Sequence, residues 1–135
     1  MICDDENDQS INPQTFALLH RIARLRLAQQ RLTVIDATNL LYPARRPLLR
    51  MARRFRLPII AIVFNIPLAT CLAHNQHRLQ RRVAPEVLQL HAGQLATTRT
   101  QLEREGPETG GYDRIYWLDE MKMNEVQVEK IRQKN

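Results

Sequence analysis

The chain has 135 residues, 44% of them hydrophobic, which is enough for one domain with one core. No apolar run approaches the roughly 18 residues of a transmembrane helix, and the acidic start lacks the features of a signal peptide, so we expect a cytoplasmic protein with no membrane partner. The net charge of +6, with 17 arginines among 20 basic residues, favours an anionic partner. A basic surface without a partner is the alternative interpretation.

The first half of the chain predicts helices and strands in alternation. Helical spacing of apolar residues predicts a helix over 14–30, and Leu32-Thr-Val-Ile-Asp36 predicts a short buried strand. A very basic helix is expected over 43–55. Residues 58–66 predict the strongest strand, because their run of consecutive apolar residues suits a strand covered on both faces, as in a parallel sheet.

The second half continues the alternation. In order, we expect a helix over 67–76, a basic loop over 78–82, a helix over 85–104, a break over 106–111, a strand over 112–118 and a helical tail over 123–135. Strands that alternate with helices imply right-handed crossovers. The sequence therefore predicts an α/β domain built on a three-layer parallel sheet.

Three polar residues follow the expected strand at 32–36, and they form the first candidate site. Asp36, Thr38 and Asn39 would lie beyond the carboxyl end of a strand, where α/β sheets bind ligands. A carboxylate there could hold a metal ion through water or orient a nucleophile. Equally, Thr38 or Asn39 could simply cap the next helix.

The basic loop after the third helix is the second candidate. Arg78, Arg81 and Arg82 lie within five residues, and a mobile arginine loop can close over phosphates that are being transferred. An ordinary exposed loop would have the same composition. His74 and His77 share a helix end, but no third ligand is evident, so we expect no direct metal site.

Arginines also repeat along the expected helix at 43–55. They could follow a nucleic-acid backbone, although such a run is more often a solvated helix face. The positions are Arg45, Arg46, Arg50, Arg53 and Arg54. The sequence contains no G-x-x-x-x-G-K-[ST] motif, because none of its four glycines precedes a Lys-Ser or Lys-Thr pair.

Several motifs together resemble the kinase domain of bacterial polynucleotide kinase-phosphatase, a P-loop kinase. The similar segments, within residues 3–120, include Asp4-Asp-Glu-Asn-Asp-Gln9, Leu32-Thr-Val-Ile-Asp-Ala-Thr-Asn39, Ala44-Arg-Arg-Pro-Leu48 and Ala61-Ile-Val-Phe-Asn65. The resemblance implies transfer of the ATP γ-phosphate to 5′-hydroxyl ends of DNA or RNA during repair, with ATP and Mg²⁺ as cofactors. It implies ATP-phosphate contacts for Gln9, Arg78 and Arg81. It also implies that the phosphate and metal region is lined by Asp36, Thr38 and Asn39.

The resemblance also implies missing parts. In the family, the first strands, the phosphate-binding loop and the catalytic aspartate precede the acidic cluster, whereas Met1 falls after all of them here. We therefore expect a partial kinase domain over 1–121, with a lid around 74–85, a tail over 122–135 and no activity by itself. Other repair-enzyme modules could accompany it. A P-loop kinase for a small metabolite or nucleotide, and a non-catalytic basic nucleic-acid-binding remnant, are the alternatives.

Overall fold

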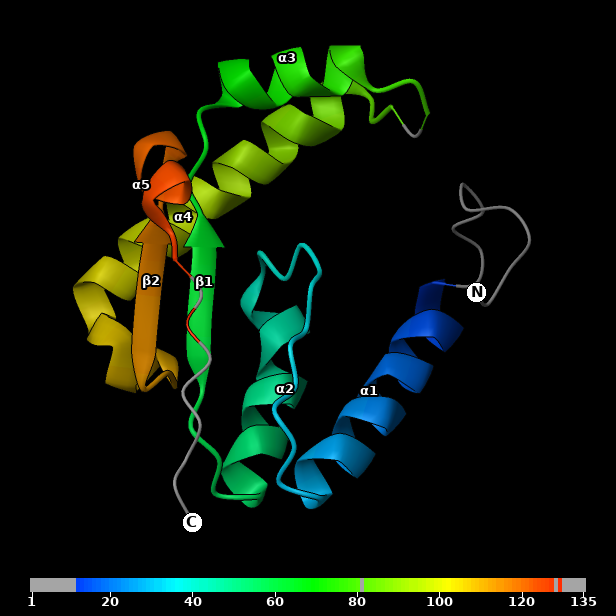
Figure 1. Cartoon of the computed structure of the whole chain (residues 1–135), viewed down its shortest axis with the longest axis vertical. Coiled ribbons are helices and arrows are strands. Elements are labelled where there is room, and N and C mark those ends of the chain that lie inside the picture. Colours follow the sequence, from blue (N-terminus) through cyan, green and yellow to red (C-terminus); the bar gives the residue numbers. More distant parts are fainter. Residues whose placement is uncertain (1–11, 81, 128, 130–135) are drawn as a thin grey trace.

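A computed structural model describes residues 12–80, 82–127 and 129. The elements are, in chain order, α1 (Asn12–Ala28), α2 (Tyr42–Arg54), β1 (Ile60–Phe64), α3 (Leu68–His77), α4 (Pro85–Gly110), β2 (Arg114–Leu118) and α5 (Glu120–Glu125). Figure 1 shows β1 and β2 side by side, with α4 behind them, α3 above, and α2 and α1 to one side. The predicted α/β class is confirmed, and residues 58–66 and 112–118 do contain the two strands.

The sheet is parallel, as the helix–strand alternation predicted. Ile60 pairs with Arg114 at one end of the register and Phe64 with Leu118 at the other. The backbone N–H of Asn65 extends the ladder by donating to the Leu118 carbonyl at 2.7 Å. The path from β1 through α3 and α4 to β2 is the helical crossover that two parallel strands require.

One face of the sheet packs on the core. Its most buried side chains are Leu49 of α2, Leu102 of α4 and Tyr112, with Ile59, Ala61, Ile115 and Trp117 packed against them. The alternate side chains of β1 face the other way, and Ile60, Ile62 and Phe64 are 55%, 58% and 55% exposed. The expectation that β1 is covered on both faces is therefore wrong for the described residues, because α2 and α4 supply the core on one face only.

The expected strand at 32–36 is also wrong. These residues are extended but belong to no ladder, and Leu32 and Val34 are 87% and 81% exposed. A strand is stabilised by a neighbour about 4.8 Å away that satisfies its backbone groups. In the described part of the chain the only ladder is that between β1 and β2, so an apolar, β-branched sequence is not enough to make this segment a strand.

The backbone at Gly106 and the side chain of Asp119 explain where one helix is interrupted and where another begins. Gly106 has φ 76° and ψ 166°, a conformation that interrupts α4 just before Pro107, so the predicted break near 106 is present inside the long helix. The helix α5 begins at an Asp119 side chain that accepts a hydrogen bond from the Lys122 amide at 2.9 Å. It ends at Glu125, and Val126 is extended, so the helical tail expected from Met123 onwards is shorter than predicted over the described residues.

Candidate functional site

A buried asparagine fixes the basic loop that follows α3. Asn75 is only 8% exposed, although its side chain is polar. Its Nδ2 donates to the Val83 carbonyl at 2.7 Å, and its Oδ1 accepts from the Val83 amide at 2.9 Å. Both polar ends of the side chain are therefore satisfied by one residue eight positions later. This pair of hydrogen bonds closes the loop at its base and sets where the loop arginines emerge.

Arg78 and Arg82 stand on this closed loop. The Arg78 amide donates to the Asn75 carbonyl at 3.3 Å, and the Arg82 Nε donates to the Arg78 carbonyl at 2.8 Å. Both side chains are exposed, and no carboxylate of the described residues lies within 4.0 Å of either guanidinium. Arg81 lies outside the described residues. The loop therefore presents positive charge that is available to an anion.

The C-terminal end of the Asp36–Asn39 segment is held by hydrogen bonds to its backbone. Asn39 adopts φ 42°, in the left-handed region that asparagine tolerates well. The guanidinium of Arg45 donates to the Asn39 carbonyl at 3.0 Å and also contacts the Leu40 carbonyl, which accepts a further hydrogen bond from the Thr98 hydroxyl at 2.7 Å. The side chain of Asp36 is exposed, so its carboxylate is open to solvent and to ligands.

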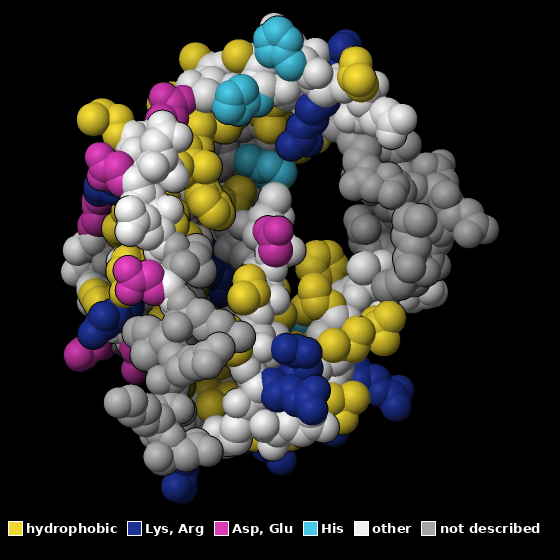
Figure 2. Space-filling view, in the orientation of Figure 1, with side chains coloured by type: hydrophobic (Ala, Val, Ile, Leu, Met, Phe, Trp, Pro, Cys, Tyr) yellow, Lys and Arg dark blue, Asp and Glu magenta, His cyan; other side chains and the backbone are white. Residues whose placement is uncertain are grey.

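The two candidate regions are separate in this structure. Figure 1 places the loop after α3 at the far end of that helix, away from the turn that leads into α2. Figure 2 shows the molecule hollowed between the part that carries α3 and α4 and the part that carries α2. No hydrogen bond or ion pair among the described residues joins Arg78 or Arg82 to Asp36, Thr38 or Asn39. Gln9 lies outside the described residues, so its predicted contact stays a prediction.

Sequence reasoning gave no structural role to Arg45, which it grouped with the basic helix face. Its Nε atom is buried and has no hydrogen-bond partner in the described chain, while the other end of the guanidinium binds the backbone before α2. Arg45 also lies beside the Tyr112 hydroxyl. Burial raises the pKa of that hydroxyl, and the nearby Arg45 charge opposes the rise. In the sequence Arg45 is one of five arginines in this helix, and nothing in the pattern distinguishes it from the other four.

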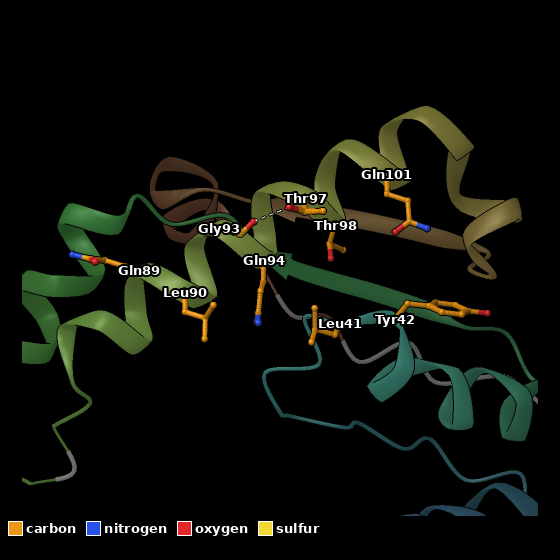
Figure 3. A pocket seen from close by; sticks show the side chains of 9 residues that line it. All are labelled: Leu41, Tyr42, Gln89, Leu90, Gly93, Gln94, Thr97, Thr98 and Gln101. Atoms are coloured by element: carbon orange, nitrogen blue, oxygen red, sulfur yellow. Dashed lines mark hydrogen bonds between the residues drawn. The ribbon is translucent and has the colours of Figure 1, made fainter.

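An uncharged groove lies between α4 and the start of α2. Figure 3 shows Leu90 and Gln94 pointing from α4 toward the space that Leu41 and Tyr42 border. The remaining lining residues are Gln89, Gly93, Thr97, Thr98 and Gln101. Amide and hydroxyl groups of this kind donate and accept hydrogen bonds without carrying charge. The helical spacing of residues 90, 94, 97 and 101 could have revealed this face in the sequence.

The described residues contain no group of three or more histidine, cysteine, aspartate or glutamate side chains placed to hold a metal ion. Asp36 offers one exposed carboxylate, which does not make a protein-built magnesium site. The donor set does not fit an ion held by these side chains, so no chemical step is assigned to one. The exposed guanidinium groups of Arg78 and Arg82 do suit nucleotide phosphates, which arginine binds through paired N–H donors.

Over residues 2–104 the chain matches the family model described as an AAA domain. It therefore belongs to this family, whose members are P-loop kinase-like nucleotide-binding domains. Domains of this class generally use ATP and Mg²⁺. No curated protein matches the sequence. Within the described part of the chain, none of the helices is long and apolar enough to cross a bilayer.

Proposed function

We propose that the chain forms part of an ATP-dependent kinase that phosphorylates the 5′-hydroxyl ends of DNA or RNA during nucleic-acid repair. The family match over residues 2–104 is the observation that carries this proposal, because it places a P-loop kinase-like domain across most of the chain. The finer assignment, to polynucleotide ends, is supported by the motifs Asp4–Gln9 and Asp36–Asn39 and by the exposed arginines of the first half.

In this reaction the attacking 5′-oxygen forms a bond to the γ-phosphorus while the bond to the leaving diphosphate oxygen breaks. Charge spreads over the transferring oxygens, and fixed cations stabilise it. We assign this role to Arg78 and Arg81, with Gln9 as a further phosphate contact. Arg82 is exposed on the same loop and could contribute. Asp36, Thr38 and Asn39 would line the phosphate and metal region, and the Asp36 carboxylate is exposed.

The test is transfer of labelled γ-phosphate from ATP to an oligonucleotide with a 5′-hydroxyl. We expect no transfer by these 135 residues without further polypeptide, because the sequence has no G-x-x-x-x-G-K-[ST] motif. An extended polypeptide that carries such a motif ahead of Met1 should be active. In that protein Arg78→Ala should lower kcat about 100-fold, as removal of one preorganised donor typically does. Robust turnover by the 135 residues would contradict the proposal of inactivity.

Arg104→Ala is the matched control for the Arg78 variant. Arg104 is an exposed arginine whose side chain is 78% accessible, and it lies on α4 away from the basic loop. The proposal predicts that its loss leaves kcat unchanged. Equal loss of kcat in both variants would show that the effect comes from general charge rather than from a phosphate contact.

A second candidate, a kinase for a small metabolite or nucleotide, is favoured by one observation. The groove between α4 and α2 has no charged residue, and the side-chain amides of Gln89 and Gln94 make no hydrogen bond with the described residues, which suits a neutral polar acceptor. Comparing oligonucleotides with small hydroxyl compounds as acceptors of the extended protein separates the two candidates. Faster transfer to a small compound, reduced by Gln94→Ala, would favour the second.

A further inference from the structure

Charge is divided unevenly between the two halves of the molecule. Residues 12–84 contain 13 arginines and a single carboxylate, Asp36, whereas residues 85–129 contain four basic and nine acidic side chains. The three ion pairs among the described residues lie in the second part, and they are Arg99–Glu103, Arg104–Glu105 and Lys122–Asp119. The first half therefore carries an excess of positive charge that forms no ion pair with a described carboxylate.

The structure separates the arginines of α2 into two groups. Arg45 turns back to bind the Asn39 carbonyl, and the guanidinium of Arg53 lies against Gly111, although the Arg53 side chain is itself exposed. The other three are exposed, and none makes a hydrogen bond or an ion pair with the described residues. These three, Arg46, Arg50 and Arg54, are called the arginine stripe below.

The arginine stripe has a regular geometry. Its members are four residues apart, so they lie on one side of α2 and follow each other by about 6 Å along the helix axis. A row of planar guanidinium groups at this spacing can bind successive phosphates of a nucleic-acid strand, and arginine also stacks on exposed bases.

An anionic membrane would be the other polyanion to consider. A helix that lies in a membrane surface inserts an apolar side beside its basic side. In α2 the apolar side is already used, because Leu49 is 5% exposed within the core and Leu48, Met51 and Ala52 are partly buried. Only the basic side of α2 is available, and this favours a nucleic-acid strand.

We propose that the arginine stripe of α2 binds the phosphate backbone of single-stranded nucleic acid without sequence preference. This surface goes beyond the phosphotransfer proposal, because it needs neither a nucleotide nor an active enzyme. It would hold the strand by charge and by stacking, whichever base is present.

The test is the binding of a fluorescein-labelled 20-nucleotide oligothymidylate to the full chain, measured by fluorescence anisotropy between 25 and 200 mM salt without ATP. The variant Arg46→Gln, Arg50→Gln, Arg54→Gln removes the stripe. Since each phosphate contact on a single strand contributes about 0.7 to the slope of log affinity against log salt, we expect the slope to fall by about 2. We also expect weaker binding at every salt concentration, and circular dichroism should show the same melting curve for both proteins.

The matched control is Arg104→Gln, Arg114→Gln, Lys122→Gln, which changes the net charge by the same amount on exposed residues outside α2. The proposal predicts that the control keeps the wild-type slope. An equal fall in both variants, or no fall in the stripe variant, would overturn it. Vesicles of 30% phosphatidylserine should bind weakly and without dependence on the stripe, and stripe-dependent vesicle binding tighter than oligonucleotide binding would also overturn it. Because ATP is absent, failure of the kinase proposal would leave these results unaffected.

Discussion

Replacement of Asn75 by alanine should release the loop after α3. The side chain makes two hydrogen bonds to the Val83 backbone, at 2.7 and 2.9 Å. A hydrogen bond of this kind contributes about 1 kcal/mol net, so Asn75→Ala should cost about 2 kcal/mol in the free energy that keeps the loop closed. Since 1.4 kcal/mol is a factor of ten, the open loop should become about 30-fold more populated.

Native-state amide hydrogen exchange measures this opening directly, because the Val83 amide is one of the two groups that Asn75 protects. We expect its exchange to accelerate about 30-fold in Asn75→Ala, with a much smaller change for amides of β1. Gln76→Ala is the matched control, since Gln76 is the next residue of α3 and is exposed. Unchanged exchange at Val83, or equal acceleration in the control, would refute the assignment of Asn75 as the residue that closes the loop.

Three further predictions concern the core. Leu49→Ala should lower the free energy of unfolding by about 3 kcal/mol in urea denaturation, because Leu49 is 5% exposed at the centre of the core cluster. Gly111→Ala should destabilise the protein by about 1 kcal/mol in the same assay, because Gly111 has φ 90°, a backbone conformation that alanine adopts only with strain. Burial raises the pKa of Tyr112, so the native state holds its phenol proton more tightly than the unfolded state does. The associated stability should be complete below about pH 10 and be lost as pH rises through the native pKa, and Tyr112→Phe should abolish this alkaline loss in urea titrations at several pH values.

The helices could be predicted from the sequence because their signals are local. Apolar residues at helical spacing located α1, α2, α3 and the start of α4, and the break expected over 106–111 marked the interruption of α4. The apolar run at 59–64 located β1 for the same reason. The candidate residue Arg78 was found from its position after α3, whereas Asp36 was found from an expected strand that the structure does not contain; both residues are exposed.

Strand pairing and the roles of individual arginines depended on contacts between distant residues. Residues 32–36 have the composition of a strand and still pair with nothing in the described chain, because a ladder requires a second backbone at the right distance. Asn75 gained its role only when the fold brought Val83 to both ends of its side chain. The sequence by itself determined that the first half is basic. The tertiary structure decided which arginines have protein partners, because the packing of α2 brings the Arg45 guanidinium to the Asn39 carbonyl and leaves Arg46 facing solvent.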